Sequence, residues 1–334
     1  MRIAADRPAE ARGLTRDGVR LLVATPDGLA HETFRDIGRF LAPGDLLVIN
    51  TSATVPAAID GHRQDGRPVI VHLSTPLDDG TWVAELREPP PAVARVRDTT
   101  AGETIALPSA ASATLLQRYP DPGADRLWTI RLFGTGPVGD YLNRYGRPIR
   151  YSYVPNPVPL AAYQNVFARE AGSAEMPSAG RPFTTELITG LVAAGVVIAP
   201  LTLHTGVASL EAGEQPLPER FAVPEPTARL VNLTRGAGGR VLAVGTTVTR
   251  ALETAADDAG TVRPSGGWTD LVLGPDRPAR AVAGLITGWH DPEASHLGLL
   301  QAVAGPALVT AAYEEADKQG YLGHEFGDSC LLLP

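Results

Sequence analysis

A glycine followed by two threonines opens a segment that could bind an anion. In residues 244–253, VGTTVTRALE, Gly245 follows a strand-like run and precedes a helical pattern. Free N–H groups at such a helix start can hold a carboxylate or a phosphate, and Arg250 could add a fork of donors. The spacing is not that of a P-loop, because no Gly-Lys-Ser/Thr follows. The alternative is a well-capped helix whose Arg250 pairs with Glu253 or lies on the surface.

Two histidine-containing segments could exchange protons near neutral pH. His204, in residues 203–209, LHTGVAS, is expected at a strand end, where a histidine can act as general acid or base. His290 lies in residues 288–296, GWHDPEASH, together with His296. Because no third ligand stands at a recognised metal spacing, no metal site is predicted. The alternative for each histidine is a hydrogen-bonded structural residue.

Trp289 gives the second of these segments another possible role. It stands close to acidic residues and could hold a cation by its ring face and the neighbouring charge. Asp291 suits the cap of a helix whose first residue is Pro292. The alternative is therefore a capped helix with Trp289 packed in the core.

Two more segments place ionisable side chains next to small residues. Residues 172–184, GSAEMPSAGRPFT, are predicted to form a loop in which Glu175 and Arg181 carry opposite charges and Thr184 caps the following helix. Residues 324–328, HEFGD, hold three ionisable side chains. Either segment could border a ligand. The alternatives are an ordinary surface loop and a solvated turn.

The amino-acid composition excludes several classes of protein. The chain has 334 residues, 44% of them hydrophobic and 20% charged, which is typical of a folded protein of about two domains. The single cysteine, Cys330, excludes an intrachain disulfide and a cysteine metal cluster. The net charge of −8 argues against a large basic surface for nucleic acid, although a local patch can occur on an acidic protein. No apolar run has the length of a membrane span, and the polar residues 1–10 are unlike a secretory signal, so we expect a cytoplasmic protein.

The pattern of hydrophobic residues predicts an α/β fold interrupted by a small all-β unit. From about residue 57 to residue 140, short apolar runs are separated by turn residues, as in an all-β unit. On either side of it, strands alternate with helices, which favours a sheet with helices packed on it. The expected strands are residues 19–25, 45–50, 196–204, 240–245 and 281–287. The expected helices are residues 34–41, 184–194, 248–256, 293–303 and 307–318. Pro200 predicts a bulge or an edge in its strand.

The segments together, in their order along the chain, resemble the S-adenosylmethionine:tRNA ribosyltransferase-isomerase family of queuosine biosynthesis. The matching positions run through most of the chain. They are Arg16-Asp17, Arg20-Leu21-Leu22-Val23, Gly44-Asp45-Leu46-Leu47-Val48, Asn50, Pro56-Ala57, Tyr163-Gln164, Val166, Ala168, Gly172-Ser173, Pro177, Ala179-Gly180, Phe183-Thr184, Thr202-Leu203-His204, Gly206, Ala243-Val244-Gly245-Thr246-Thr247, Arg250, Leu252-Glu253, His290, Pro292 and Gly327-Asp328. No single motif is decisive, but the ordered set is specific.

The resemblance implies a fold, a reaction and a site. The fold is an α/β domain, residues 1–57 and 141–334, with an inserted antiparallel β-barrel, residues 58–140. The reaction moves the ribosyl part of S-adenosylmethionine to a 7-aminomethyl-7-deazaguanine in tRNA, with release of adenine and methionine and without a metal. The expected catalytic residues are His204, His290 and Glu175. The expected binding residues are Ser178, Gly180, Arg181, Phe183, Thr205, Gly206, Gly245, Thr246, Thr247, Arg250, Trp289 and Asp328.

Three departures from the family pattern leave the acceptor open. Ser178, Arg181 and Pro182 replace a threonine, a leucine and a histidine of the family. Two family arginines are absent near Pro56, and residues 216–219, PLPE, lack another histidine. Lost arginines weaken contacts to anions and tRNA. The alternatives are a divergent enzyme with a non-tRNA acceptor, and a non-catalytic paralogue that binds a ligand or RNA.

Overall fold

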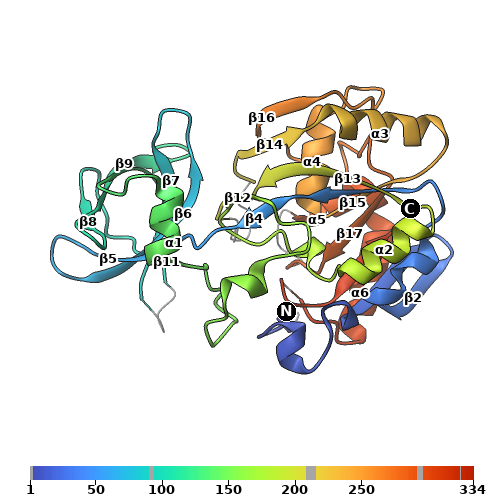
Figure 1. Cartoon of the computed structure of the whole chain (residues 1–334), viewed down its shortest axis with the longest axis horizontal. Coiled ribbons are helices and arrows are strands. Elements are labelled where there is room, and N and C mark those ends of the chain that lie inside the picture. Colours follow the sequence, from blue (N-terminus) through green and yellow to red (C-terminus); the bar gives the residue numbers. More distant parts are fainter. Residues whose placement is uncertain (1–2, 90–93, 208–215, 292–295, 324) are drawn as a thin grey trace.

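The chain folds into a large lobe and a smaller all-β lobe, which are joined by narrow connections (Figure 1). A computed structural model describes residues 3–89, 94–207, 216–291, 296–323 and 325–334. Within these residues no helix is both long enough and apolar enough to cross a membrane. The large lobe holds both ends of the described chain.

A mixed nine-stranded sheet forms the centre of the large lobe. Its spatial order is β16 (Ser265–Thr269), β14 (Glu219–Val223), β13 (Val197–His204), β3 (Leu46–Asn50), β15 (Val241–Val244), β17 (Gly284–Gly288), β18 (Ser329–Leu332), β1 (Arg20–Thr25) and β2 (Gly28–Thr33). The four strands β13, β3, β15 and β17 run parallel. Their carboxyl ends therefore meet at one edge, where open α/β sheets bind ligands.

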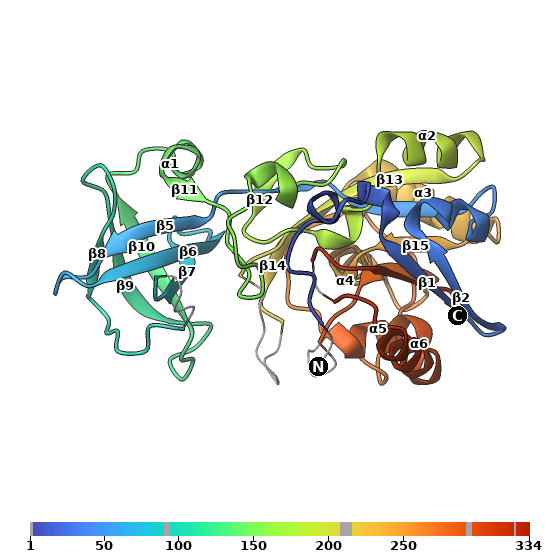
Figure 2. The same cartoon turned by 90° about the horizontal axis from the view of Figure 1, so that it is seen from below.

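Helices cover both faces of this sheet because its central strands are apolar on both sides. In β3, Leu46 and Val48 point into one core, whereas Leu47 and Ile49 point into the other. The first core is covered by α3 (Glu225–Gly236), α4 (Thr246–Ala255), α5 (His296–Ala304) and α6 (Pro306–Lys318). The second is covered by α2 (Thr185–Ala193) and the 3-10 helix η3 (Phe34–Phe40). Figure 2 shows α2 and the α5–α6 pair on opposite sides of the lobe.

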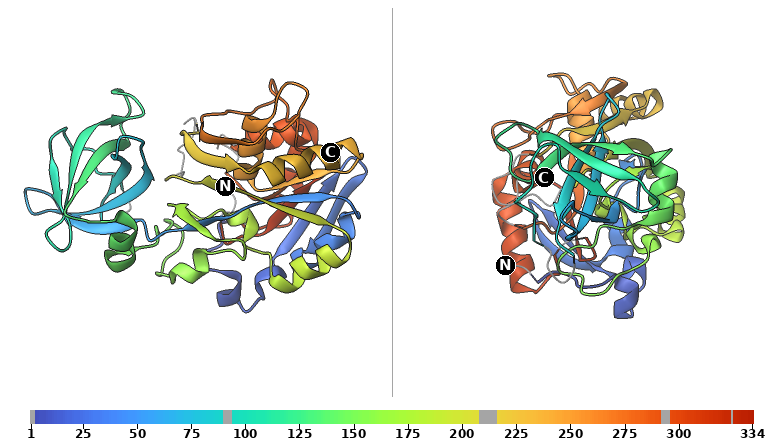
Figure 3. Two further views of the ribbon diagram at one scale, coloured as in Figure 1. Left: turned by 45° about the horizontal axis from the view of Figure 1, so that its top comes forward. Right: turned by 90° about the vertical axis from the view of Figure 1, so that its left-hand side faces the viewer.

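The smaller lobe is a closed antiparallel sheet. Its order is β11 (Gly146–Arg147), β5 (Ala58–His62), β6 (Pro68–Pro76), β7 (Trp82–Arg87), β10 (Leu127–Phe133), β9 (Ser112–Tyr119) and β8 (Thr104–Ala106), and a β5–β8 pairing closes it (Figure 3). Helix α1 (Val138–Tyr145) contributes Tyr141 and Leu142 to the barrel core. The expected α/β fold with a β-barrel is confirmed. The boundaries at residues 57 and 140 stay a prediction.

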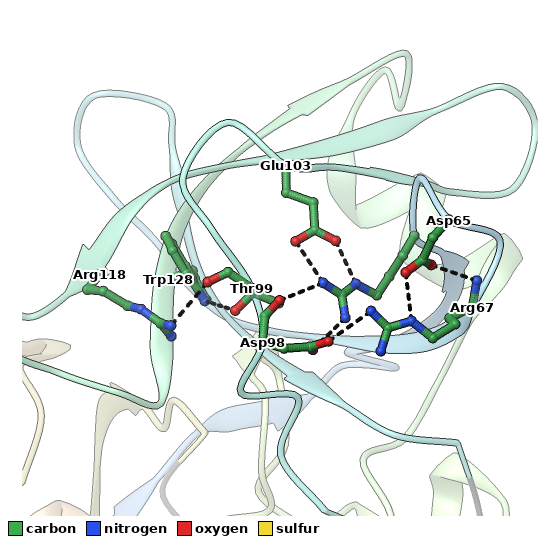
Figure 4. A network of polar contacts seen from close by, with 8 residues as sticks. Asp65, Arg67, Asp98, Thr99, Glu103, Arg118 and Trp128 are labelled. Atoms are coloured by element: carbon green, nitrogen blue, oxygen red, sulfur yellow. Dashed lines mark hydrogen bonds and ion pairs between the residues drawn. The ribbon is translucent and has the colours of Figure 1, made fainter.

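A buried arginine fixes one side of the barrel. The guanidinium of Arg63 donates to Glu103 and to Asp98, each at 2.6 Å, and Arg67 reaches the same Asp98 at 2.8 Å. These carboxylates raise the pKa of Arg63 above its usual value. Figure 4 shows this network beside Trp128, whose indole N–H donates to Thr99 at 3.2 Å. The network ties the loop around Asp98 to the barrel wall.

Short elements connect the two lobes and complete the large one. A two-stranded parallel pair, β4 (Ser52–Thr54) with β12 (Glu170–Ser173), extends from β3 toward the barrel. The remaining turns are 3-10 helices: η1 (Ala9–Arg12), η2 (Arg16–Gly18), η4 (Leu160–Tyr163) and η5 (Ser178–Gly180).

Most expected strands and helices are confirmed within a few residues. Residues 34–41 fold as the 3-10 helix η3, and α2 begins after Thr184, whose hydroxyl accepts the Leu187 N–H at 3.1 Å as predicted. Pro200 lies where β13 pairs with β3 alone, because β14 pairs only from Thr202 onward. Its missing N–H therefore faces a local edge, and this part of the prediction is confirmed.

Candidate functional site

A cavity lies between the carboxyl ends of the parallel strands and the barrel. Its volume is about 140 Å³. The large lobe contributes residues from the ends of β13, β15 and β17, while Ser74, Thr75, Val83 and Tyr119 come from the barrel. Nine of the expected site residues line it. They are Glu175, Ser178, Thr205, Gly206, Gly245, Thr246, Thr247, Arg250 and His290.

The turn from β15 into α4 forms one wall of this cavity. Gly245 has a φ of 102°, a left-handed value that favours glycine, and its N–H donates to the Ile286 carbonyl at 2.8 Å. A Cβ there would lie 3.2 Å from the Cβ of Ala179. No side chain of the described residues caps α4. The N–H groups at its start therefore suit an anion entering the cavity.

Arg250 has a structural role that the sequence did not reveal. Its guanidinium is buried and pairs with Glu219, and it also donates to the carbonyls of Leu271 at 3.1 Å and Thr269 at 3.2 Å. Glu253, the partner suggested by sequence spacing, instead accepts backbone N–H groups of residues 280–282. Its donors are therefore engaged by protein groups, while the residue still lines the cavity, so ligand binding by Arg250 stays a prediction. The arginine holds the cavity wall together.

A second wall comes from the loop before α2 and the end of β13. The Thr205 hydroxyl donates to the Glu175 carbonyl at 2.6 Å, which fixes the backbone beside the Glu175 side chain. A Cβ at Gly206 would lie 2.6 Å from the Ser74 hydroxyl oxygen. That oxygen accepts the Val207 N–H at 2.8 Å. A glycine is needed there because the barrel approaches so closely.

Two stacked histidines face the same cavity. The rings of His290 and His296 lie 4.4 Å apart and almost parallel. The His290 Nε2 lies 3.1 Å from the Thr287 hydroxyl, which fixes the ring orientation. Burial, and to a smaller extent the charge of Arg250, lowers the pKa of His296 to about 4. His296 is therefore neutral at pH 7, so it does not add positive charge beside His290.

His204 and Trp289 do not line the cavity. The His204 Nδ1 lies 2.7 Å from the Ser52 hydroxyl, and its ring packs against Gly172. Burial lowers the pKa of His204. Trp289 is 1% exposed and packs edge-on against Tyr313 and Tyr321. For both residues the structure therefore supports the structural alternative.

Four further expected residues support the site from outside its lining. Phe183 packs in the core, and Gly180 allows the close approach of Asn165. Arg181 donates to Glu10 at 2.9 Å and lies over the Phe326 ring. The Asp328 carboxylate accepts the backbone N–H groups of Arg20 and Leu322, both at 2.9 Å. None of these four lines the first cavity, although Arg181 and Asp328 line a small neighbouring one, and their contact with a ligand stays a prediction.

Sequence reasoning missed several residues of the lining. The barrel residues Ser74 and Tyr119 carry no local signal, because only the packing of the two lobes brings them to the cavity. Glu325 also lines it. The sequence did indicate that the ionisable residues 324–328 could border a ligand, but their spacing did not single out Glu325 among them. Pro292, Glu293 and His324 lie outside the described residues.

A second cavity, of about 410 Å³, adjoins the first. Glu175 and Val207 line both. Its wall carries Arg87, Arg147 and Arg150 together with His72, Tyr151 and Tyr163. Arg147 pairs with Asp60 at 2.6 Å, whereas Arg150 donates to the Pro155 carbonyl at 3.0 Å. This cavity thus combines aromatic and cationic groups next to the first.

Known proteins match the chain along almost its whole length. The model of a family described as "Queuosine biosynthesis protein" matches residues 1–332. An S-adenosylmethionine:tRNA ribosyltransferase-isomerase of Acidiphilium cryptum is 38% identical, with 98% of this chain and 96% of that protein covered. One of Symbiobacterium thermophilum is 36% identical, with the same coverage. The crystal structure of S-adenosylmethionine tRNA ribosyltransferase from Thermotoga maritima is 30% identical, covers 99% of this chain and 96% of its own, and has a TM-score of 0.53.

Proposed function

The chain belongs to the queuosine biosynthesis protein family, and we propose that its first cavity binds S-adenosylmethionine for transfer of the ribosyl unit to a tRNA base. The protein is a transferase-isomerase of this family. Of the possibilities that the sequence left open, family membership supports this activity over a non-catalytic paralogue. The acceptor is a 7-aminomethyl-7-deazaguanine, and adenine and methionine leave.

The observation that carries the proposal is the start of α4, which no side chain of the described residues caps, beside the first cavity. S-adenosylmethionine presents a carboxylate at its methionine end, and the N–H groups after Gly245 suit that charge. Apolar side chains of Leu271, Leu273 and Leu299 line the same cavity and suit the flat adenine ring. The chemical features of the ligand thus fit the lining residues.

The reaction begins with removal of a proton from C5′, which the neighbouring sulfonium makes more acidic. Glu175 and His290 line the cavity and are the candidates for that base. His290 keeps a fixed orientation through Thr287. His204 has no direct part in this scheme, because it lies outside the lining.

The acceptor base enters from the second cavity. Glu175 lies between the two cavities, so an aminomethyl group reaching toward it would meet the ribosyl carbon held in the first. Arg150 supplies positive charge at the second cavity, where an RNA phosphate would lie, whereas Arg147 is paired with Asp60. Glu85, Glu88 and Glu175 also line this cavity, so phosphate contacts would depend on single arginines of an otherwise acidic surface.

Product analysis tests the proposed function. The purified protein is incubated with S-adenosylmethionine and tRNA that carries the aminomethyl-deazaguanine, and the tRNA nucleosides are analysed by mass spectrometry. We expect a nucleoside with the added rearranged ribosyl unit, formed together with free adenine. tRNA with an unmodified guanine at that position is the control. Adenine release without any change in the tRNA would contradict tRNA as the acceptor.

A further inference from the structure

Glu325 is a half-buried residue at the first cavity whose carboxyl group the scheme above does not use. It lines that cavity and also a small neighbouring one next to Ser178 and Gly288. Its Oε2 is buried and has no hydrogen-bond partner within the described part of the chain. A buried polar atom without a partner is costly, so such an atom at a cavity suggests a function there.

The loop that carries Glu325 is held firmly in place. The Asp328 carboxylate accepts the N–H groups of Arg20 and Leu322, and Arg12 donates to the Phe326 carbonyl at 2.8 Å. The Phe326 ring is buried against Tyr163 at a centroid distance of 5.4 Å. Asp328 was expected to bind ligand directly, but it instead braces this loop. The loop therefore presents Glu325 at a fixed position.

The charged groups around Glu325 have partners of their own. Arg181 and Arg16 line the small neighbouring cavity, and both pair with Glu10, at 2.9 and 3.0 Å. Asp328 lines that cavity too, and His290 and Glu175 share the first cavity with Glu325. Burial, and to a smaller extent the charges of Glu325 and Glu175, raises the pKa of the Tyr151 phenol.

Burial of its carboxyl group favours the protonated form of Glu325. It raises the pKa of this carboxyl to about 7, although a hydrogen bond from the residue's own backbone N–H acts in the opposite direction. Glu219, another carboxyl in the lining, pairs instead with Arg250. Glu325 can therefore hold a proton near neutral pH, where most glutamates are ionised.

We propose that Glu325 is the general acid that protonates the departing adenine. This proposal rests on the proposed function. The C1′–N9 bond breaks and its electron pair moves to adenine, while the O–H bond of Glu325 breaks and an N–H bond forms on a ring nitrogen of adenine. Glu325 becomes a carboxylate, and solvent returns its proton. A carboxyl group that shares the cavity with the purine can perform this step directly, whereas neutral His296 has only the N–H of an uncharged imidazole, which is a much weaker acid.

The experiment measures adenine release against pH for the wild type, Glu325→Gln and Glu325→Asp. The wild-type rate should fall as the pH rises through about 7, because the acid form of Glu325 is lost. Glu325→Gln should be ~10²–10⁴-fold slower and lack this dependence, and Glu325→Asp should recover part of the rate. Glu314→Gln, an exposed glutamate on α6, is the matched control and should behave as the wild type.

Two outcomes separate the proposal from the function on which it rests. If the wild type releases adenine and Glu325→Gln keeps the same rate and pH profile, the acid role of Glu325 is wrong and the function stands. If the wild type releases no adenine, the proposed function itself fails. Infrared difference spectra of wild type against Glu325→Gln test the protonation state without turnover. A protonated carboxyl band that disappears near pH 7 is expected, and its absence at pH 6 overturns the proposal.

Discussion

The cavity contains ionisable side chains whose surroundings push them toward different protonation states. Burial keeps His296 neutral and raises the pKa of Glu325, while Glu219 is held against Arg250. Sites in which neighbouring groups have pKa values shifted in different directions are typical of proton-transfer chemistry. Each group acquires its state from neighbours that are distant in the sequence.

His290 is the histidine that we expect to matter for turnover. Replacing it with alanine removes a proton-exchanging group from the cavity wall, so adenine release should fall by ~10²-fold or more. The thermal midpoint should change little. His62→Ala, on an exposed position of β5, is the control for loss of a histidine. A rate within twofold of the wild type for His290→Ala would contradict its place in the site.

His204→Ala should behave differently, because His204 hydrogen-bonds to Ser52 behind the cavity. Its loss should lower stability by about 1–3 kcal/mol in urea unfolding, since it leaves a buried hydroxyl with one partner fewer. Turnover per folded molecule should stay close to that of the wild type. A large loss of turnover in a fully stable variant would restore His204 as a catalytic candidate.

The pKa of His296 links stability to pH. Its folded value of about 4 lies below the usual 6.5, so the unfolded chain binds more protons between these values. The stabilising contribution is present above pH 6.5 and is lost as the pH falls toward 4, by up to about 3 kcal/mol. Urea unfolding between pH 4 and 8 should show this slope in the wild type. His296→Gln should flatten it, and an unchanged slope would contradict the buried neutral state.

At the residue scale, the sequence could single out the glycine–threonine turn, Glu175 and His290, all of which line the cavity, because each stands at a strand end or in a loop at the sheet edge. Their roles toward a ligand stay predictions. The sequence left two interpretations open for Trp289, since a tryptophan beside acids can equally well fill a core, and the packing against Tyr313 favours the core. Glu325 could not be singled out, because its importance depends on burial and not on spacing.

At the scale of elements, the cap of α2 offers a quantitative test. The Thr184 hydroxyl accepts the Leu187 N–H, so Thr184→Ala should destabilise the protein by about 1 kcal/mol. Thr185→Ala, on the exposed first helical residue, is the control and should have little effect. Both values come from urea unfolding. Equal losses in the two variants would show that the hydroxyl does not cap the helix.

The central strands were predictable because each is a continuous apolar run that must be buried. The strand β16 was not, since its residues 265–269, SGGWT, include two glycines. The strand β14, with the residues ERFAV, carries β-favouring side chains but was not among the expected strands. They become strands because β14 pairs with the edge of β13 and β16 then pairs with β14. These contacts join segments that are distant in the sequence. The helix α3 was missed as well, because its hydrophobic face is short.

At the scale of the whole molecule, the barrel and the large lobe together enclose the cavity. Asp78 of the barrel accepts a hydrogen bond from Trp268 at 3.0 Å and pairs with Arg220, both of the large lobe. Ser74 and Gly206 meet at another point of the junction. The change from alternating strands and helices to short apolar runs separated by turn residues predicted an inserted β unit. It could not predict that this unit would supply part of the ligand-binding wall.

The charge distribution predicts strongly salt-dependent tRNA binding. Because the net charge is −8, contacts to phosphates must come from local groups such as Arg150. The logarithm of the binding constant should fall with the logarithm of the salt concentration with a slope of about −2 or steeper. Arg150→Ala should reduce the slope by about 1, whereas Arg229→Ala on α3 should not change it. Tight binding that does not respond to salt would contradict this account.

The central claim is that the cavity between the parallel strand ends and the barrel binds S-adenosylmethionine. A crystal structure of the protein soaked with S-adenosylmethionine tests it most directly. The account predicts density for the carboxylate at the start of α4 beside Thr246 and Thr247, with the purine within reach of Glu325. Density for the ligand in the second cavity, with the first one empty, would contradict the account.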